Sequence, residues 1–186
     1  MKYLKSLGLI VVLAAMFATC AAYASATTLT SSSGSTPSFS LSSEGHVVID
    51  NPIAKIECAV SMAGKAESHS GGVTVTGNLS SLSFTGCTNS WHLTVVSAGS
   101  FSLHATSGGN ATWTSSGVNV EATRFGIICR YTTASTDFGT LTNGEHATLD
   151  LSSAVPVEGS ALCDVGTNTA TGSLKMTSPT NVSVDP

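Results

Sequence analysis

The sequence predicts an all-β protein, folded as an antiparallel β-sandwich or flattened barrel of about eight to ten strands. Three observations support this prediction. Apolar and polar residues alternate with a period of two in several segments, glycine pairs separate these segments, and no convincing amphipathic helix follows residue 24. Because side chains alternate between the two faces of a strand, one face of each predicted strand is expected to be buried.

The first 24 residues have the features of a signal peptide. Two lysines precede the apolar stretch Leu7–Phe17, and Ala22-Tyr23-Ala24 places small residues where signal peptidase reads them. We expect cleavage after Ala24, with a site after Ala26 as the alternative, and the apolar stretch is too short to remain as a membrane span. The mature protein is therefore expected to be exported without a transmembrane anchor, to the medium, the cell surface or the periplasm.

The rest of the chain divides into a lead-in and one domain. Residues 25–43 are rich in serine and threonine, as in Ser31-Ser32-Ser33-Gly34-Ser35, and are expected to form a flexible lead-in. Residues 44–186 are long enough for a single β domain with one core.

Turn-forming residues mark the connections between the predicted strands. Asn143-Gly144 is the strongest short hairpin signal, because a type I′ turn requires positive φ at both central residues. Gly71-Gly72 and Gly108-Gly109 mark further turns. The clearest alternating segments are 73–76, 101–105, 118–122 and 147–151.

The stretch Phe125–Cys129 is the least polar in the mature chain. This composition favours a central strand that is covered on both faces. At the edge of a sheet, the same stretch would instead invite the addition of a strand from another chain.

Two disulfides are expected. Cys20 should leave with the signal peptide, since Phe17-Ala18-Thr19 is a poor match to the pattern that precedes a lipidated cysteine. An even number of cysteines in an oxidising compartment favours disulfides. The chain has no CxxC motif, which argues against a metal site. Of three possible pairings we prefer the one that joins the first two and the last two cysteines, because these intervals resemble a faint internal repeat. The preferred disulfides are Cys58–Cys87 and Cys129–Cys163.

The composition is poor in charge. Charged residues make up 10% of the chain, and serine and threonine make up about a third of it after residue 24. Without the signal peptide, five basic and eleven acidic residues leave a net charge of −6. This acidic balance disfavours nucleic acid as a partner, and hydroxyl groups rather than charges keep the surface hydrated.

The sequence contains no catalytic, cofactor-binding or metal-binding pattern. It lacks GxSxG, HExxH, P-loop and dinucleotide motifs, and its five histidines are not spaced as metal ligands. The segment Asp164–Asn168 could offer oxygens to calcium, but a plain turn is favoured because an EF-hand glycine and distal glutamate are missing. Trp91 and Trp113 are expected in the core or at its rim rather than in a sugar-binding platform. We therefore expect a protein that is not an enzyme and has no cofactor.

Several short motifs resemble one family of exported proteins. Cys58 is followed by a glycine-flanked Val-Thr strand leading into Ser83-Phe84-Thr85-Gly86-Cys87, then by Gly99–Leu103 and a closing Gly172–Met176. In this arrangement, which spans most of the mature chain, the sequence resembles the secreted protein activators of alkane oxidation and similar exported actinobacterial proteins. It has Ser100-Phe101 where that family has Pro-Trp. The resemblance implies an exported, non-enzymatic protein that helps cells to use or contact hydrophobic substrates, and it brings no catalytic residues.

Three functions are compatible with these observations, in order of preference. The first is an accessory protein at the cell surface or in the medium that promotes contact with, or use of, hydrophobic substrates such as alkanes. The second is a self-assembling subunit of a surface fibre or biofilm matrix, which donates segment 25–50, with Phe39-Ser40-Leu41 and Val47-Val48-Ile49, to a neighbouring copy. The third is a glycan-binding module.

Overall fold

The computed structural model describes residues 28–31, 38–51, 54–67, 74–106, 108–163 and 166–185. The expected signal peptide, Cys20 and the expected Gly71-Gly72 turn lie outside the described residues. Regular structure in the described part consists of strands and two short 3-10 helices. In chain order these elements are β1 (Thr28–Ser31), β2 (Ser38–Ser43), β3 (Val47–Asn51), β4 (Ala54–Ala66), β5 (Thr74–Thr85), η1 (Thr88–Ser90), β6 (His92–Ser97), β7 (Ser100–Thr106), β8 (Asn110–Ser116), β9 (Asn119–Arg124), β10 (Ile127–Thr132), β11 (Thr136–Thr142), β12 (Gly144–Glu145), β13 (Thr148–Gly159), η2 (Ala161–Cys163), β14 (Gly166–Ser178) and β15 (Asn181–Asp185).

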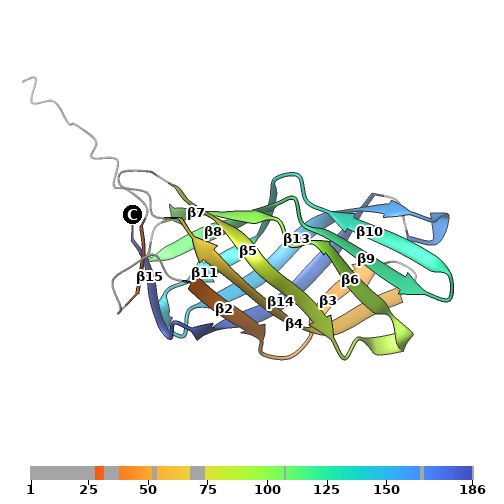
Figure 1. The fold of residues 1–186 in the computed structure, drawn as a ribbon, viewed down its shortest axis with the longest axis horizontal. Helices are drawn as coiled ribbons and strands as arrows, with labels where there is room; N and C mark the ends of the chain where they lie inside the picture. Colours follow the sequence, from red (N-terminus) through yellow and green to blue (C-terminus); the bar gives the residue numbers. More distant parts are fainter. Residues whose placement is uncertain are drawn as a thin grey trace, which may run out of the picture.

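The strands form a closed antiparallel barrel (Figure 1). Eight strands pair in a ring in the order β2, β4, β5, β7, β8, β11, β13 and β14, and β14 pairs with β2 to close it. Because the order around the ring follows the chain, the barrel is an up-and-down meander closed by its first and last strands. The predicted all-β fold is confirmed, and a barrel is the form that it takes.

The wall of the barrel continues beyond this ring through interrupted strands. β2 and β3 both pair with β4 and β14, and β10 and β11 both pair with β13. In the same way, β9 pairs with β10 as β8 pairs with β11, and β6 pairs with β9 as β7 pairs with β8. The long strands β4, β5, β13 and β14 run through both parts, so the barrel is elongated (Figure 1).

A seam opens in the wall where β5 parts from β6. Ser80 is an extra residue in β5 opposite β4, and such a bulge bends its strand. The Leu79 N–H donates to the Gly99 carbonyl oxygen over 3.1 Å, and beyond this bond β5 and β6 do not pair. Gly99 has a φ of 71°, and a Cβ there would collide with the Ser116 carbonyl oxygen, so only glycine fits at the branch point. Among the residues that the structure describes, one edge of β6 and one edge of the second half of β5 are therefore unpaired.

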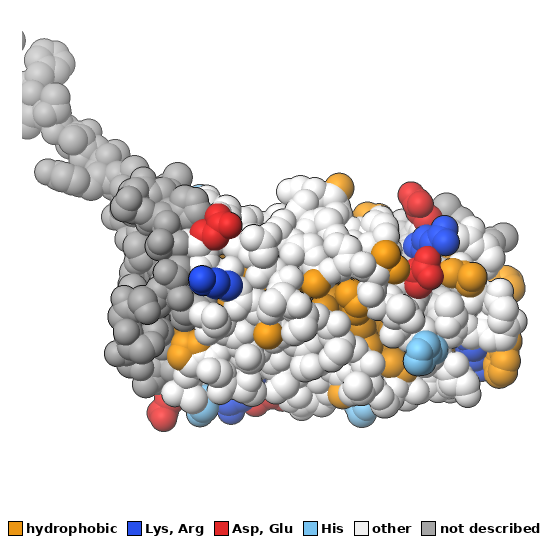
Figure 2. All heavy atoms as spheres, in the orientation of Figure 1, with side chains coloured by type: hydrophobic (Ala, Val, Ile, Leu, Met, Phe, Trp, Pro, Cys, Tyr) orange, Lys and Arg blue, Asp and Glu red, His pale blue; other side chains and the backbone are white. Residues whose placement is uncertain are grey.

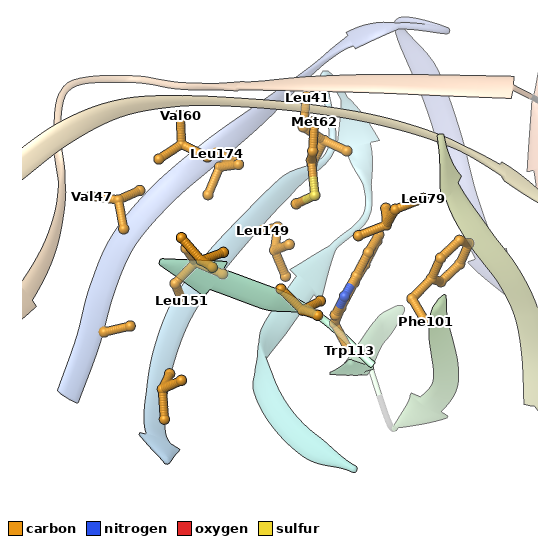
Figure 3. Close-up of a cluster of buried hydrophobic side chains, with 14 of the residues drawn as sticks. Leu41, Val47, Val60, Met62, Leu79, Phe101, Trp113, Leu149, Leu151 and Leu174 are labelled. Atoms are coloured by element: carbon orange, nitrogen blue, oxygen red, sulfur yellow. The ribbon is translucent and has the colours of Figure 1, made fainter. Parts of the chain in front are cut away.

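Three aromatic rings fill the part of the barrel that the ring of eight strands encloses, which we call the closed part. Phe101 and Trp113 stack with their ring centroids 4.6 Å apart, and both are labelled in Figure 3. Phe39 packs edge-on against each of them, with centroid distances of 5.2 and 5.8 Å. Trp113 and Trp91 are both buried, which confirms that these tryptophans belong to the core and its rim.

Residues 38–43 belong to the barrel and not to a flexible lead-in. Their strand, β2, pairs with β4 and β14, and its Phe39 and Leu41 side chains are buried. The predicted domain boundary at residue 44 is therefore too late. The serines that suggested a linker alternate with these two apolar residues, so the segment has the period of a strand despite its composition.

Asn143-Gly144 does not form the predicted two-residue turn. Thr142 pairs with Thr148, so the hairpin between β11 and β13 has the longer connection 143–147. The Asn143 side chain instead bonds to the backbone of Val184: Nδ2 donates to its carbonyl oxygen over 3.0 Å, and Oδ1 accepts from its N–H over 2.8 Å. These bonds attach a small sheet of β1, β15 and β12 to the barrel.

A two-residue turn forms at Phe125-Gly126. Arg124 pairs with Ile127 across it, and the two turn residues have φ values of 48° and 81°, as a type I′ turn requires. The Phe125 side chain is 83% exposed and that of Ile128 is 43% exposed. The prediction that Phe125–Cys129 is covered on both faces is therefore wrong, because its first two residues form the tip of the hairpin.

Phe125→Asn is expected to raise the free energy of unfolding by about 1 kcal/mol. A bulky residue at positive φ costs about 1–2 kcal/mol, whereas asparagine is favoured at this position of a type I′ turn. The loss of the contact between the ring and the Arg124 guanidinium, 5.0 Å from its centroid, offsets part of the gain. Urea unfolding measures the change, and Phe125→Ala, which keeps the backbone strain, serves as the control. A destabilised Phe125→Asn variant would contradict the argument.

Candidate binding site inside the barrel

The interior of the barrel contains a cavity of about 80 Å³ with an almost entirely apolar wall. In Figure 3, its large lining side chains point into the interior from different strands. Barrels of this strand number are just wide enough to be filled by side chains or to hold one small ligand. The apolar cavity is therefore the first candidate for a binding site. Lining residues labelled in Figure 3 include Val47, Val60, Met62, Leu79, Trp113 and Leu151.

A small side chain on β14 borders this space. Ala170 on β14 lines the cavity, and it pairs with Ser153 on β13. Gly172, the next inward position of β14, has no side chain, and a Cβ there would meet Val47 at 3.0 Å. The inward row of β14 then changes to the large side chains Leu174 and Met176, and Leu174 also lines the cavity.

At the seam the cavity wall comes close to solvent. The lining residues Leu82 and Phe84 lie on the half of β5 that pairs with β4 alone and are only half-buried, whereas Leu79, before the seam, is buried. Since no backbone hydrogen bonds join β5 to β6 beyond Leu79, the wall can open here at the lowest cost. We expect molecules to enter through the seam.

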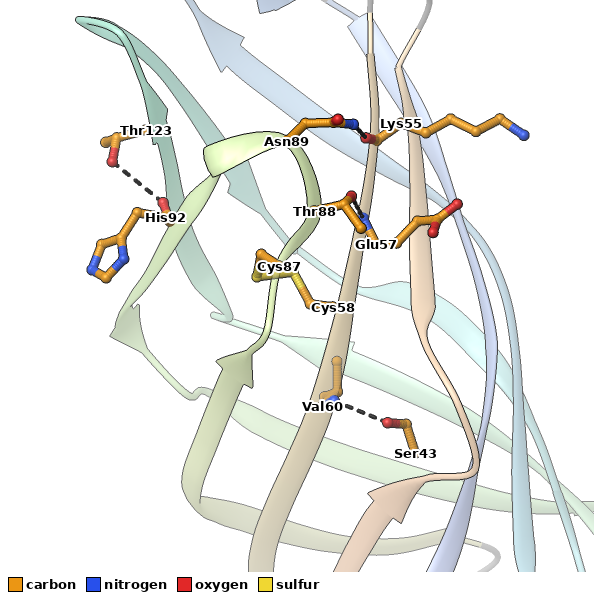
Figure 4. Close-up of a disulfide and its surroundings, with 10 residues drawn as sticks. All are labelled: Ser43, Lys55, Glu57, Cys58, Val60, Cys87, Thr88, Asn89, His92 and Thr123. Carbon is orange, nitrogen blue, oxygen red and sulfur yellow. Dashed lines mark hydrogen bonds between the residues drawn. A yellow bond between two sulfur atoms is a disulfide. The ribbon is translucent and has the colours of Figure 1, made fainter.

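The Cys58–Cys87 disulfide holds the end of β5 beside the seam (Figure 4). It joins β4 to the loop that follows β5, and two hydrogen bonds support the same contact. Thr88 Oγ1 accepts from the Glu57 backbone N–H over 3.1 Å, and Asn89 Nδ2 donates to the Lys55 carbonyl oxygen over 3.4 Å. The half of β5 that pairs with β4 alone is thus also anchored at its far end.

The second disulfide, Cys129–Cys163, joins β10 to η2. The Cys163 carbonyl oxygen also accepts a hydrogen bond from Asn51 Nδ2, over 2.8 Å. Both predicted pairings are confirmed, and these four cysteines are the predicted site residues that the structure brings together. They are structural crosslinks and do not line the cavity.

A buried polar cluster lies next to the cavity. Tyr131 lines the cavity, and its hydroxyl accepts a hydrogen bond from Asn168 Nδ2 over 3.3 Å. Asn51 also bonds to the Tyr131 hydroxyl, which connects the cluster to β3. Asn168 belongs to the segment considered above as a turn or a calcium site. Its side chain faces the barrel interior, while Asp164 and Val165 lie outside the described residues.

Tyr131 is expected to ionise above its ordinary pKa of about 10 in the folded protein. Burial raises the pKa of its hydroxyl, and the hydrogen bonds from Asn168 and Asn51 oppose this only in part. A raised pKa in the folded state means that the associated stability is present below pH 10 and is lost as the pH rises above it. Tyrosinate absorbance during a pH titration measures the pKa, and Tyr131→Phe should remove this part of the alkaline destabilisation. Ionisation at the ordinary value in the folded protein would contradict the burial argument.

Two hydroxyl groups of the cavity wall already have partners. Ser115 Oγ accepts from Trp113 Nε1 over 3.2 Å, and Thr133 Oγ1 accepts from the Val118 backbone N–H over 3.0 Å. Both hydroxyls are buried. They satisfy donors within the wall, which leaves the surface facing the cavity apolar.

A larger groove, of about 260 Å³, lies on the outer face of β5, β7 and β8. It is shallow and is lined largely by polar side chains, such as Thr76, Asn78, Ser102 and Thr114. The Phe101 ring beside it is buried and stacked on Trp113. Sugar sites commonly use exposed aromatic faces, so this groove is a weaker candidate than the cavity.

The end of the barrel that carries the β9–β10 hairpin exposes apolar side chains. We refer to Phe125, Ile128 and Leu162 as the apolar tip; their exposed fractions are 83%, 43% and 52%. The Ser160 N–H donates to the Ile128 carbonyl oxygen over 3.4 Å, which brings η2 and its Leu162 next to β10. In Figure 2, hydrophobic side chains gather at this end of the molecule.

Charged groups contribute little to the interior. The described residues contain no group of three His, Cys, Asp or Glu side chains that could hold a metal ion. The ion pairs Lys55–Asp50, Arg130–Glu121 and Lys175–Glu44 all involve side chains that reach solvent. Glu121 raises the pKa of Arg130 through a hydrogen bond and its charge, and this pair lies on the outside of the β9–β10 hairpin.

Comparison of the chain with protein-family models, with curated proteins and with solved structures gives no match. In the part of the chain that the structure describes, no helix is both long and apolar enough to cross a membrane.

Sequence reasoning missed the cavity and the polar cluster beside it. The inward rows can be recognised from their alternation, but which row is too small to fill the barrel depends on the residues opposite. One signal was available in the sequence. Asn168 and Ala170 alternate with threonines before Gly172, so an asparagine occupies a core-facing position of a strand.

Proposed function

We propose that this chain is an exported, non-enzymatic accessory protein that holds a small apolar molecule, such as a short alkane, inside its barrel. The apolar cavity of about 80 Å³ is the observation that carries this proposal. The expected signal peptide, the low charge and the resemblance to activators of alkane oxidation support the same function.

The character of the cavity favours an apolar occupant over water. Water in a protein interior needs about two to four polar partners, and apolar cavities without them stay dry and bind small apolar molecules. An engineered cavity of about 150 Å³ is known to accept benzene. The cavity of about 80 Å³ in this protein therefore suits a shorter or thinner molecule. A longer alkyl chain could place its remaining carbons in the seam, against Leu82 and Phe84.

Thermal unfolding of the purified secreted protein in buffer with and without n-hexane tests the proposal. A molecule that binds only the folded state raises Tm in proportion to the logarithm of its concentration above Kd. The fluorescence of Trp113, which lines the cavity, provides a second measure of binding. We expect both to change on addition of n-hexane.

Two matched substitutions locate the binding. Ala170→Leu places a larger side chain in the cavity, whereas Ala154→Leu makes the same change on the outer face of β13, where Ala154 is exposed. We expect Ala170→Leu to abolish the effect of n-hexane and Ala154→Leu to retain it. An effect that survives Ala170→Leu, or no effect on the wild-type protein, would remove the cavity as the binding site.

The apolar tip supports contact with a hydrophobic phase. It exposes three large side chains at one end of a charge-poor protein, so it can enter an apolar phase with little loss of hydration. The double variant Phe125→Ser and Leu162→Ser is expected to adsorb less at a hexadecane–water interface, as measured by interfacial tension. Val96→Ser removes a side chain that is 58% exposed on β6 and serves as the control. Equal adsorption of all three proteins would exclude a role for the tip.

The open edge of β6 favours a second candidate function, a self-assembling fibre or matrix subunit. An unpaired edge can accept a strand from another copy. The described part of the segment considered for donation, β2 and β3, is paired within its own barrel, so donation would require exchange between copies. Cell-surface and medium fractions run on an unboiled, non-reducing gel would reveal assemblies. We expect the Val96→Lys variant, with a charge at the edge of β6, to run without these assemblies. Assemblies that persist in this variant would exclude the edge.

A further inference from the structure

We propose that the end of the barrel with the apolar tip binds a fatty-acid anion, with its carboxylate on Arg124 and its alkyl chain against the exposed side chains of the tip. The inference extends the role proposed for the apolar tip, but Arg124 and the tip residues do not line the cavity that carries the proposed function. An arginine without an acidic partner, directly beside exposed apolar side chains, is the observation that supports it.

Arg124 lies at the end of the inward-facing row of β9. The two residues before it in this row are buried, and Arg124 itself is partly buried. The register that pairs His92 with Thr123 places Trp91, just before β6, next to Arg124. The guanidinium lies 5.8 Å from the ring centroid of Trp91 and 5.0 Å from that of Phe125, so two aromatic rings hold its position.

The Arg124 guanidinium has no acidic partner in the described chain. It forms no ion pair and no hydrogen bond with any residue that the structure describes. Glu121, on the same strand, lies in the outward-facing row and accepts a hydrogen bond from Arg130 Nε over 2.7 Å. A charge that is partly removed from water without a partner is unfavourable. An anion at Arg124 would remove this cost.

The outer nitrogens of the Arg124 guanidinium are accessible from solvent. Of its three nitrogens, only Nε is buried without a partner. The two Nη groups also form no hydrogen bond within the described chain, so they are the nitrogens that reach solvent. Guanidinium N–H groups bind the two oxygens of a carboxylate in parallel. A molecule outside the barrel can therefore bind Arg124 without entering the interior.

Exposed apolar side chains continue from Arg124 into the apolar tip. Phe125 is the next residue along the chain and is 83% exposed. Ile128 follows across the turn, and Leu162 is held next to β10. An alkyl chain attached to a carboxylate on Arg124 would meet Phe125 directly beside its head group, and its burial there would add to the affinity.

A single negative charge on an alkyl chain suits this site better than other head groups do. Arg124 supplies one positive charge, whereas a phosphate monoester carries up to two negative charges. An extended anionic membrane would be repelled by the expected net charge of −6, which an isolated carboxylate feels far less. A quaternary ammonium group would meet the like charge of the guanidinium. We therefore assign the site to a carboxylate.

Calorimetric titration of the secreted protein with octanoate, 1-octanol and octyltrimethylammonium tests the inference. The comparison is made in the wild type, in Arg124→Gln and in Arg130→Gln, which removes the same charge from the outer face of the same hairpin. We expect octanoate to bind Arg124→Gln at least about tenfold more weakly than the wild type, as the loss of charge-assisted hydrogen bonds implies. Its affinity for Arg130→Gln should stay within about twofold of the wild-type value, and 1-octanol should not distinguish the three proteins.

Ala170→Leu separates this site from the cavity. Because Ala170 lines the cavity, this variant should lose the effect of n-hexane and still bind octanoate as the wild type does. Arg124→Gln should keep the effect of n-hexane on Tm. Its own Tm should be no lower than that of the wild type, since the substitution removes an unpaired charge, and this measurement shows that the variant is folded.

The outcomes separate this inference from the proposed function. Octanoate that binds the wild type and Arg124→Gln equally, or that fails to bind the wild type, refutes the carboxylate site, while an effect of n-hexane through the cavity would leave the proposed function intact. Loss of octanoate binding in Ala170→Leu would place the alkyl chain in the cavity and overturn the inference. Binding through Arg124 to vesicles of anionic phospholipid, without binding to octanoate, would overturn it in favour of a membrane surface. If n-hexane has no effect but octanoate binds through Arg124, the proposed function fails and this site is supported.

Discussion

Trp113→Ala is expected to lower the free energy of unfolding by about 3–5 kcal/mol, as large-to-small substitutions of buried aromatic residues do. Trp113 is the largest of the fully buried side chains, and its ring stacks on Phe101 and contacts Phe39 edge-on. It also lines the cavity, so the space left by the ring would merge with the existing one. Because the net stability of a domain is about 5–15 kcal/mol, this loss would leave the barrel marginally folded.

Urea unfolding followed by circular dichroism measures this loss. Trp113→Phe is the matched control, because it keeps an aromatic ring at the centre of the cluster and removes the bond to Ser115 Oγ. We expect the phenylalanine variant to lose less than half as much stability as the alanine variant. A Trp113→Ala protein within about 1 kcal/mol of the wild type would show that the aromatic cluster does not stabilise the closed part of the barrel.

Removal of either disulfide is expected to cost about 3–4 kcal/mol in the chain-entropy model. The linked cysteines are 29 and 34 residues apart in sequence, so the two crosslinks restrict the unfolded chain to a similar extent. The double variants Cys58→Ala with Cys87→Ala and Cys129→Ala with Cys163→Ala serve as controls for each other. Each would be compared with the wild type by urea unfolding without reductant.

The two double variants should differ in their local effects. Loss of Cys58–Cys87 releases the end of β5 beside the seam, so amide hydrogen exchange should increase in the second half of β5. Loss of Cys129–Cys163 should increase exchange around η2 instead. Stability within about 1 kcal/mol of the wild type in both variants would contradict the crosslinking argument.

Local patterns in the sequence predicted the fold class and the crosslinks. Alternation in segments such as 101–105 and 147–151 corresponds to β7 and β13, because side-chain direction in a strand depends only on position along the chain. The disulfide pairing was also predicted correctly from the similarity of the two cysteine intervals.

The predictions that failed required knowledge of neighbouring strands. Asn143-Gly144 has the preferred sequence of a type I′ turn, but the Asn143 side chain bonds to Val184, 41 residues further along the chain. Phe125-Gly126 adopts the type I′ φ angles although phenylalanine is disfavoured there, because the pairing of β9 with β10 leaves only two residues for the turn. In both hairpins, strand register determined the turn.

The sequence by itself determined most of the strands, the crosslinks and the inward-facing rows of apolar residues, since each depends on residue type and local spacing. Only the tertiary structure decided that β14 closes on β2, that β5 and β6 part at a seam, and that Ser153 and Ala170 face each other beside a cavity. Closure and cavity depend on which side chains meet across strands, and pairings between residues more than 100 positions apart, such as Leu41 with Met176, leave no local pattern in the sequence.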